Sequence, residues 1–346
     1  MVEKKIFDKE LNKIDVKENG ITELDPSILE ILLKDRTSKK NIIWATDTYK
    51  SKGILYYENA PITIELITGR NGNVIKPRTE KSKKEQQIRS RNKAEVFTPS
   101  WICNVQNNLV DEAWFGYKNV FNIEKENKWK VNNEKIKFLY DKSWQDYVLE
   151  NRLEMSCGEA PYLVSRYDTV TGIIIPIKER IGILDRKLRI ICENINNEDE
   201  WWVWTELAYK HIYGYDWQGD NILIARENLL FTLIDYYEET FNKKINTERL
   251  LYFAEIISWN IWQMDGIKGV IPNSCKNEIF EQINLFGEKI SIGNKCSGCA
   301  KGNILKHNGK KCLIMDWDKN KKIKYISLLG GKKWKKLNSI VHLSIN

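Results

Sequence analysis

The sequence predicts an α/β protein whose core is a doubly wound sheet, and three observations support this fold class. Short strand-like runs end in an acidic residue or a glycine at three places, residues 153–158, 212–216 and 260–266. Segments with apolar residues at helical spacing lie between these runs. The 346 residues are enough to bury a full α/β core and to form a second module. Strands and helices that alternate in this way form a parallel sheet with helices on its faces.

The composition narrows the class of partner. The chain has 55 Lys and Arg against 47 Asp and Glu, a formal net charge of +8, which favours a polyanionic partner. No apolar run approaches the length of a membrane span or a signal peptide. The 7 cysteines are odd in number and scattered, so they do not suggest a disulfide framework. We therefore expect a cytoplasmic protein without a membrane partner.

Residues 1–93 are predicted to form an N-terminal α+β region that ends in a basic linker. The amphipathic stretch Pro26–Leu33 predicts a short helix. Three runs rich in β-branched and aromatic residues predict strands, with a turn at residues 69–72, and these runs are Ile42–Ala45, Gly53–Tyr57 and Ile62–Thr68.

The basic linker is a candidate DNA contact. Between residues 76 and 93, basic side chains are frequent and acidic ones are few. Such a run can follow a DNA backbone, because each phosphate contact adds salt-dependent affinity. An ordinary solvated linker or helix face is the alternative. The predicted DNA-binding residues are Lys81, Lys83, Lys84, Arg89 and Arg91.

The predicted core spans residues 94–275 and begins with a helix. Ser100 is a suitable N-cap for a helix over Trp101–Trp114, where apolar residues lie near helical spacing. Residues 115–148 are predicted to be a polar, aromatic-rich connection to the first strand.

The stretch Leu153–Leu163 is predicted to be a strand that ends in a turn at Gly158, with a helix after it. A glycine there lets the backbone approach a ligand closely, and the start of a helix offers free N–H groups. The acidic Glu154 fits an amine-bearing ligand better than a pyrophosphate. The stretch has neither a dinucleotide fingerprint nor a phosphate loop, which disfavours a nicotinamide-dependent oxidoreductase. Taken alone, it also fits an ordinary strand-turn-helix corner.

Two helices, Ile181–Asn194 and Glu198–His211, are predicted between the first and second strands. Their basic residues alternate with Trp201, Trp202 and Trp204, and such a pattern can stack on nucleic acid. We favour a core position for these tryptophans, because aromatic residues at helical spacing are usually buried.

Two further strand-like runs end in a carboxylate. Asp216 ends the second run, and a helix is predicted after it over residues 221–241. A carboxylate at the carboxyl end of the second strand can accept hydrogen bonds from both ribose hydroxyls of a nucleotide. The third run, residues 260–267, contains Asp265, which could hold the amine of an adenine. Each acid also has an alternative as a turn residue or a helix cap.

These motifs resemble those of adenine-specific DNA methyltransferases of restriction-modification systems, of the gamma class or the type I modification subunits. Glu154–Leu163 resembles their Asp-Pro-Ala-Cys-Gly-Ser-Gly-x-Phe-Leu signature. Residues 214–229 resemble Gly-x-Asp/Glu…Ala-Arg-x-Asn-Leu, and residues 260–267 resemble Asn-Ile-x-x-Gly-Asp-x-Leu. Upstream, residues 94–99 are similar to Gly-Glu-Phe-Phe-Thr-Pro. The four motifs occur in the order of the family and cover about residues 94–270.

The resemblance implies a Rossmann-like core that binds S-adenosylmethionine, with the two helices between the first and second strands as a helical insertion. Glu154 and Gly158, with Cys157 beside them, would line the methionine and ribose side. Asp216, next to Trp217, would hold the ribose hydroxyls, and Asp265 the adenine. The turn that covers the cofactor would consist of Phe97, Thr98 and Pro99.

The sequence also departs from the family pattern. Met155 replaces the usual proline, and Glu159 and Ala160 replace the usual Ser/Thr-Gly. The catalytic Asn/Asp-Pro-Pro-Tyr/Phe motif is missing, and Pro272–Cys275 is its nearest counterpart. We therefore expect a truncated methyltransferase, or a subunit completed by another chain such as a specificity subunit. The alternative is a non-catalytic cofactor-binding or zinc-bearing DNA recognition protein.

Residues 276–346 are predicted to form a small C-terminal module. The Cys-x-x-Cys pair Cys296 and Cys299, with His307 and Cys312, offers four soft ligands for a tetrahedral structural zinc. The alternative is a pair of buried cysteines and a surface histidine. Zinc would hold together a β module around residues 311–329, and the basic tail at residues 330–337 follows it.

Overall fold

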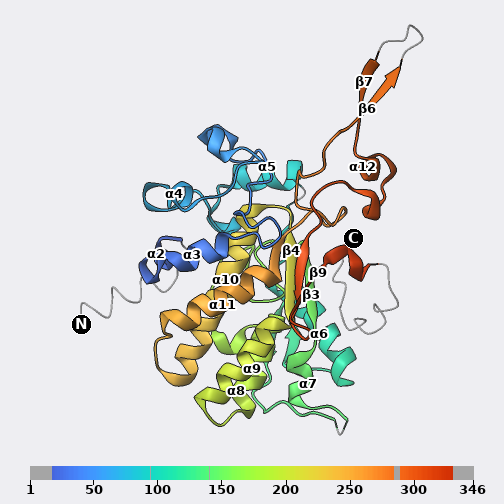
Figure 1. The fold of residues 1–346 in the computed structure, drawn as a ribbon. Helices are drawn as coiled ribbons and strands as arrows, with labels where there is room; N and C mark the ends of the chain where they lie inside the picture. The colour runs from blue at the N-terminus through green and yellow to red at the C-terminus, as the bar shows by residue number, and fades with distance from the viewer. Residues whose placement is uncertain (1–17, 94, 140, 284–288, 330–346) are drawn as a thin grey trace.

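The centre of the molecule is a small parallel sheet. The computed structural model describes residues 18–93, 95–139, 141–283 and 289–329 (Figure 1). The sheet contains β3 (Arg152–Met155), β4 (Ile212–Asp216) and β5 (Ile261–Gln263) in the order β3-β4-β5. Both pairs are parallel, with Glu154 opposite Gly214 and Tyr215 opposite Trp262. The fold is thus mixed α/β, and the three strands lie where the sequence predicts them.

Helices cover one face of this sheet (Figure 1). Helices α8 (Ile183–Asn194) and α9 (Glu198–Lys210) connect β3 to β4, and α10 (Gly219–Phe241) and α11 (Thr247–Asn260) connect β4 to β5. Their apolar stripes form the largest core with Ile212 and Ile261 of the sheet. Trp201 and Trp202 are buried in this core and Trp204 packs against it, so the expectation of core tryptophans is confirmed.

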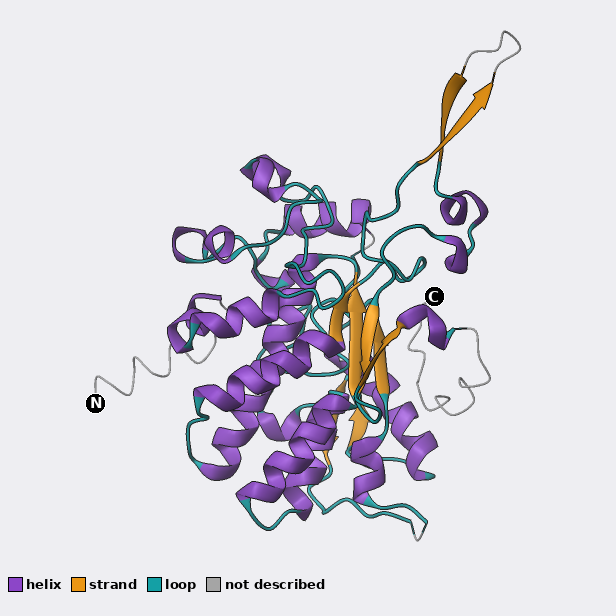
Figure 2. Ribbon diagram, in the orientation of Figure 1, coloured by secondary structure: helices purple, strands orange, loops and turns teal. Residues whose placement is uncertain are grey.

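A β-hairpin covers the other face of the sheet (Figure 2). It consists of β8 (Leu313–Asp316) and β9 (Lys321–Lys324), and the short helix η7 (Tyr325–Leu328) follows it. Successive side chains of a strand point to opposite faces, so Leu153, Tyr215 and Trp262 pack against this hairpin while their neighbours face the helices. The β module around residues 311–329 is therefore present and belongs to the core.

The N-terminal region contains the predicted helix but not the predicted strands. Helix α3 (Pro26–Leu33) follows α2 (Glu18–Leu24), and Asp25 caps α3 by accepting the N–H of Ser27 at 2.8 Å. Between residues 41 and 72 the chain makes single bridges and short helices, namely η1 (Lys50–Lys52), η2 (Ile54–Tyr56), α4 (Ile64–Ile67) and η3 (Gly69–Asn71).

The strand predictions are wrong because the backbone pairing between residues 42–45 and 58–62 stays limited to isolated contacts, and a side chain takes up the N–H and carbonyl of Ile43. The Gln263 carboxamide accepts the N–H of Ile43 at 2.9 Å and donates to its carbonyl at 2.8 Å. The β-branched residues Ile42 and Ile62 are buried, and the N–H of Ile62 donates to the carbonyl of Ile42 at 2.8 Å. The apolar pattern of this region therefore reports burial, and its few backbone hydrogen bonds form isolated bridges rather than a continuous ladder.

The middle of the chain contains η4 (Arg78–Glu80), α5 (Lys83–Lys93), α6 (Ser100–Phe115), the hairpin β1 (Asn122–Lys125) with β2 (Lys128–Val131), and α7 (Trp144–Leu149). Helix α6 lies where it is predicted, but Pro99 is its N-cap. Ser100 instead donates its backbone N–H to Asp168 at 2.7 Å, so the assignment of Ser100 as N-cap is wrong.

The helix predicted directly after Gly158 is absent. Residues 157–176 form turns, and η5 (Ile177–Glu179) follows them. The Glu154 carboxylate accepts the backbone N–H groups of Tyr162 and Leu163 at 3.5 and 3.2 Å. A carboxylate that captures N–H groups in this way favours a turn over a continuing helix.

The C-terminal module has a projecting arm. Strands β6 (Glu278–Ile283) and β7 (Lys289–Asn294) form an antiparallel hairpin that extends away from the body, with α12 (Ser297–Lys301) and η6 (Ile304–Lys306) at its base (Figure 1). The basic tail at residues 330–337 lies outside the described residues. In the described part of the chain, no helix is long and apolar enough to cross a membrane.

Candidate functional site

A cavity of about 730 Å³ opens at the carboxyl ends of β3 and β4. In parallel sheets this end is where ligands bind. Five separate parts of the chain form its wall, and the residues that line it are Ala45, Thr46, Asp47, Lys50, Glu58, Glu95, Val96, Phe97, Ser156, Gly158, Asp216, Trp217, Gln218, Asn221 and Asn273. Four predicted cofactor residues therefore meet at one cavity, namely Phe97, Gly158, Asp216 and Trp217. Ser156, which precedes the predicted Cys157 in the first motif, lines it as well.

Asp216 is the buried acid of this cavity. Its carboxylate accepts the N–H of Gly158 at 3.0 Å and the N–H of Gln218 at 2.8 Å. Burial raises the pKa of Asp216 to about 6, although the two N–H donors act in the opposite direction. Asp216 thus fixes the loop after β3 and presents a carboxylate that is ionised at neutral pH.

The Phe97 ring and Gly158 form one wall. A Cβ added to Gly158 would lie 3.5 Å from Cε1 of Phe97, so the ring lies directly on the glycine. Gly158 has a φ of 53°, in the left-handed region that glycine adopts most easily. Because Phe97 is only 8% exposed, it acts as a cover on the turn rather than as a surface side chain.

The carbonyl of Ala45 joins the separate walls of the cavity. It accepts the indole N–H of Trp217 and the side-chain amide of Asn273, each at 3.2 Å. Ala45, Ser156 and Asn273 all line the cavity and all have positive φ, at 63°, 51° and 59°. Strained non-glycine backbone of this kind concentrates at ligand sites, where the surrounding structure maintains it.

The cavity lining is acidic. It contains the carboxylates of Asp47, Glu58, Glu95 and Asp216 and the single amine of Lys50, and Glu95 is already paired with the buried Arg89 guanidinium. This charge favours a ligand that carries positive charge or donates several hydrogen bonds. Sequence reasoning missed Ala45, Asp47, Lys50 and Glu58, because no local pattern marks them and only the tertiary fold brings them here. It also missed Asn221, although this residue lies within the second motif at residues 214–229.

Two of the predicted cofactor residues near the first strand face away from the cavity. Glu154 is 4% exposed and holds the turn after β3, and burial raises its pKa. Cys157 is buried in the main core, where its Sγ would lie 3.3 Å from a Cβ on Gly214. Glu154 therefore has the ordinary role of a turn-holding acid.

Thr98, Pro99 and Asp265 do not line the cavity either. The Thr98 carbonyl accepts the hydroxyl of Thr169 at 3.1 Å, and Pro99 caps α6. The Asp265 carboxylate accepts the N–H groups of Ile267 and Lys268 and pairs with the Lys268 amine at 2.9 Å. Asp265 is thus a strand-end turn residue.

The predicted DNA-binding residues divide into two groups. Lys83, Lys84 and Arg91 are exposed on α5. Lys81 and Arg89 are buried and approach the Asp220 carboxylate at 3.6 and 2.8 Å. Their charges are used inside the protein, so these two are not available for phosphate contacts in this conformation.

Asp220 is expected to be essential for stability. Burial opposes its ionisation, but Arg89 and Lys81 outweigh burial and lower its pKa to about 2. Asp220→Ala removes the ion-pair partner of the buried Lys81 and one of the two carboxylates that pair with Arg89, the other being Glu95, which should reduce the free energy of unfolding by about 3–5 kcal/mol in urea denaturation. Glu134→Ala removes the exposed pair with Lys137 and should cost at most about 1 kcal/mol. Equal losses for the two variants would contradict this role of Asp220.

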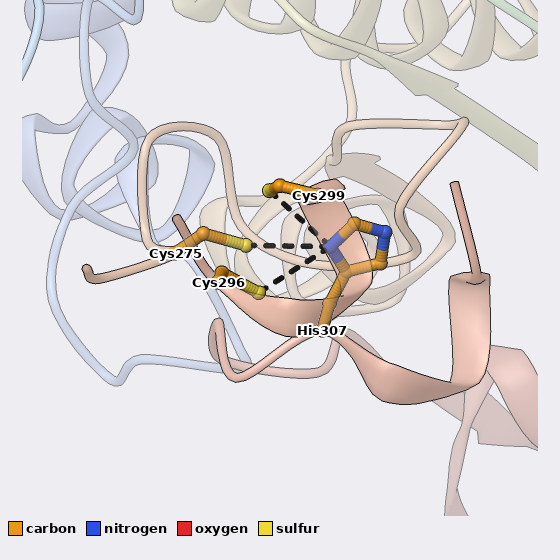
Figure 3. Close-up of side chains that lie close together, drawn as sticks. All are labelled: Cys275, Cys296, Cys299 and His307. Atoms are coloured by element: carbon orange, nitrogen blue, oxygen red, sulfur yellow. Dashed lines mark hydrogen bonds between the residues drawn. The ribbon is translucent and has the colours of Figure 1, made fainter. Parts of the chain in front are cut away.

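A second site lies at the base of the β6–β7 arm. Cys275, Cys296, Cys299 and His307 place one ligand atom each within 4.8 Å of the others. The three sulfur atoms point at Nδ1 of His307, at 3.7, 3.8 and 3.5 Å (Figure 3). Tetrahedral zinc, with Zn–S of about 2.3 Å and Zn–N of about 2.0–2.1 Å, requires S···N distances of about 3.6 Å. The cluster could therefore hold a metal ion.

Local structure prepares this site for a metal. Desolvation opposes ionisation of the Cys296 thiol, but N–H donors from Asn308 and the neighbouring turn, with the His307 ring, lower its pKa to about 6. A Cβ on Gly298 would lie 2.4 Å from the backbone N of His307, so only glycine fits there. Thiolate ligands and a tight turn are typical of a structural metal knuckle.

The prediction of Cys312 as a ligand is wrong, and Cys275 takes its place. Cys312 is fully buried on the hairpin face of the sheet, where its Sγ lies 3.6 Å from the carbonyl of Gln263. Spacing in the sequence favoured Cys312 because it follows the Cys-x-x-Cys pair closely. Cys275 is 21 residues before that pair and is brought back by the antiparallel β6–β7 arm.

Comparison of the chain with protein-family models, with curated proteins and with solved structures found no significant match.

Proposed function

We propose that this chain is the S-adenosylmethionine-binding part of an adenine-specific DNA methyltransferase of a restriction-modification system. The observation that carries the proposal is the buried Asp216 carboxylate, which lies at the carboxyl end of the middle strand and lines the cavity with Gly158 and Phe97. These residues come from three of the four motifs that resemble the family.

The sheet supports a Rossmann-like core. Its order β3-β4-β5 places three consecutive parallel strands side by side, as in one half of a doubly wound sheet. Among the described residues, β3 pairs only with β4, on one of its two edges. In the full fold the remaining strands lie beyond that free edge, and the catalytic motif follows the first of them.

The charge of the cavity suits S-adenosylmethionine. Its sulfonium and ammonium groups outweigh its one carboxylate and its ribose offers two hydroxyl donors, while the lining holds the carboxylates of Asp47, Glu58 and Asp216, the Arg89-paired Glu95 and the Lys50 amine. Asp216 would accept the ribose hydroxyls, and Phe97 would cover the cofactor. When bound, the cofactor supplies a methyl group that passes from sulfur to the N6 nitrogen of an adenine flipped out of the duplex, and N6 then loses a proton.

The partner would be double-stranded DNA, and a second protein segment would complete the site. The Asn/Asp-Pro-Pro-Tyr/Phe motif that holds the target amine in the family is not in this sequence. We propose that it is supplied by a completing or specificity subunit or by further coding sequence. The ion held by Cys275, Cys296, Cys299 and His307 would be a structural zinc, because three thiolates and an imidazole match its preferred ligands.

The test is a calorimetric titration of the purified chain with S-adenosylmethionine, with NAD as the comparison ligand. Micromolar binding of S-adenosylmethionine without binding of NAD is the expected result. A folded chain that binds neither ligand, or only NAD, would contradict the proposal.

Binding of S-adenosylmethionine is expected to depend on the charge of Asp216. Because the pKa of Asp216 is about 6, the carboxylate takes up a proton as the pH falls below 6, and affinity should fall about tenfold per pH unit. The stability of the free protein should change in the opposite direction. Since folding raises this pKa, the native state binds more protons, and the free energy of unfolding from this group increases as the pH falls from 6 towards 4. Calorimetric titrations with S-adenosylmethionine between pH 5 and pH 8 should show the loss of affinity at low pH, and Asp216→Asn should remove this pH dependence of the affinity.

One observation favours a second function, a non-catalytic DNA recognition protein. The metal cluster and its basic surroundings form a module of their own, whereas the catalytic motif is missing. Methyl transfer to adenine in DNA after a completing subunit is added would support the enzyme. DNA binding without any methyl transfer under these conditions would support the recognition protein.

A further inference from the structure

The metal cluster is surrounded by lysines. Residues 289–312 contain six lysines and neither an Asp nor a Glu. We call residues 274–278 and 295–311 the knuckle, because they include the four candidate ligands. Its exposed lysines form no ion pair with any residue of the described ranges, and they are Lys276, Lys295, Lys301, Lys306 and Lys310. The knuckle also contains one acid, the half-buried Glu278, whose carboxylate accepts the N–H of Ser297 and the side-chain amide of Asn308, each at 3.2 Å. Five exposed lysines against this one carboxylate make the surface predominantly positive.

These lysines stand on a fixed backbone. Lys276 donates its N–H to the Asn308 side chain at 3.0 Å and accepts from that side chain at 2.8 Å. Lys310 donates its N–H to the Ser274 hydroxyl at 3.0 Å. A Cβ on Gly309 would lie 2.7 Å from this hydroxyl, so the packing requires glycine. A rigid backbone reduces the entropy lost on binding, which distinguishes the knuckle from a mobile charged loop.

The knuckle is joined directly to the cavity. Cys275, a candidate ligand, is two residues after Asn273, which lines the cavity and donates to Ala45. Figure 1 shows α12 of the knuckle and α5 both at the carboxyl end of the sheet. Helix α5 exposes Lys83, Lys84 and Arg91. The acidic cavity therefore lies at the same end of the molecule as two basic surfaces.

The acidic cavity and the basic knuckle favour ligands of opposite charge. A polyanion is repelled by the carboxylates inside the cavity but attracted by the lysines near it. A duplex that contacts the knuckle with its phosphates would have its bases next to the opening of the cavity. Phosphate contacts position a protein on DNA, and they need no particular sequence.

We propose that the knuckle binds the phosphodiester backbone of double-stranded DNA at the entrance of the cavity, and that Lys276, Lys306 and Lys310 contact the phosphates. The choice of DNA rests on the proposed function. The metal ion maintains the backbone that carries these lysines, and it takes no part in chemistry.

The test compares two triple charge reversals that change the net charge equally. The first is Lys276→Glu, Lys306→Glu and Lys310→Glu. The matched control is Lys321→Glu, Lys322→Glu and Lys324→Glu. The control residues are exposed and lie on β9, and Asp318, just before β9, contacts His211 just before β4, at the opposite end of the sheet from Asp216. Fluorescence anisotropy of a labelled 20-base-pair duplex, measured between low and moderate salt, gives the affinity and its salt slope.

The knuckle variant is expected to lose at least about tenfold in affinity at low salt. Its slope of log K against log salt should fall by up to about 2.7, because each lost phosphate contact removes about 0.9. The control should keep the slope of the original protein. Equal losses in both variants would show an effect of net charge alone and would overturn the proposal, as would no loss in the knuckle variant. Equal competition by phosphatidylserine vesicles would overturn the choice of DNA.

Three further measurements keep the result interpretable. Melting temperature and bound metal should be the same in the knuckle variant as in the original protein, which shows that the knuckle is folded. Binding of S-adenosylmethionine should also be unchanged. If S-adenosylmethionine does not bind to any form but the knuckle variant alone loses DNA, the proposed function fails and the knuckle proposal stands. If S-adenosylmethionine binds and DNA affinity does not depend on the knuckle, only the knuckle proposal fails.

Discussion

Asp216→Ala is expected to weaken the binding of S-adenosylmethionine by at least about a hundredfold. The carboxylate would accept both ribose hydroxyls, and a hydrogen bond to a charged group contributes about 1.5–3 kcal/mol. Loss of two such bonds corresponds to about two to four orders of magnitude in affinity. The substitution also removes the acceptor of the Gly158 and Gln218 N–H groups, so the loop after β3 should loosen. Calorimetric titration measures the affinity, and thermal unfolding shows whether the variant is folded.

Asp265→Ala is the matched control for this prediction. Both acids follow a strand of the same sheet and both are buried, but only Asp216 lines the cavity. The turn at Asp265 should be destabilised, while affinity for S-adenosylmethionine should stay within about threefold of the original. If Asp265→Ala abolished binding and Asp216→Ala did not, the cofactor would lie elsewhere.

Cys275→Ser is expected to abolish tight zinc binding. The variant keeps three of the four ligands, and a serine hydroxyl is a poor ligand for zinc compared with a thiolate. Mutation of an outer-shell partner already costs about 10–100-fold in metal affinity, and loss of a direct ligand should cost more. Metal analysis of the purified variant should show less than one zinc per chain, whereas the original protein should hold one.

Loss of the metal should also unfold the knuckle, because the free energy of metal binding to such a site is coupled to its folding. Hydrogen exchange of the amides in residues 275–278 and 295–308 should increase in Cys275→Ser. Cys312→Ala is the control, since Cys312 lies in the hairpin core and away from the cluster. It should lose some stability through a small cavity and retain its zinc. Zinc loss in Cys312→Ala alone would support the ligand set expected from spacing.

The sequence determined the alternation of strands and helices. Strands β3, β4 and β5 and helices α8 to α10 lie where their patterns predict, because burial on one or two faces imposes a period on the residues of each element. The first and second motifs also located Gly158 and Asp216, respectively, since turn geometry and strand ends are local properties.

The tertiary structure decided which of these residues face a ligand. Glu154, Asp216 and Asp265 look alike in sequence, as acids in or after short strands, but only Asp216 lines the cavity. All three accept nearby backbone N–H groups, but Glu154 and Asp265 do so in turns that face away from the cavity, and this depends on how each loop returns to its strand. Likewise, Lys81 and Arg89 belong to a basic run, yet buried carboxylates turn them inward: Asp220 of α10 approaches both, and Glu95 also pairs with Arg89.

Long-range contacts also decided which cysteines can act as metal ligands and which structure residues 42–68 adopt. Cys275 and Cys312 are both cysteines near the Cys-x-x-Cys pair, and the pairing of β6 with β7 selects Cys275. Residues 42–68 have the composition of strands but receive their hydrogen bonds partly from the side chain of Gln263, about 220 residues away. A pattern of residue types reports burial and local turns, whereas the partner that satisfies each polar group is fixed only when distant parts of the chain meet.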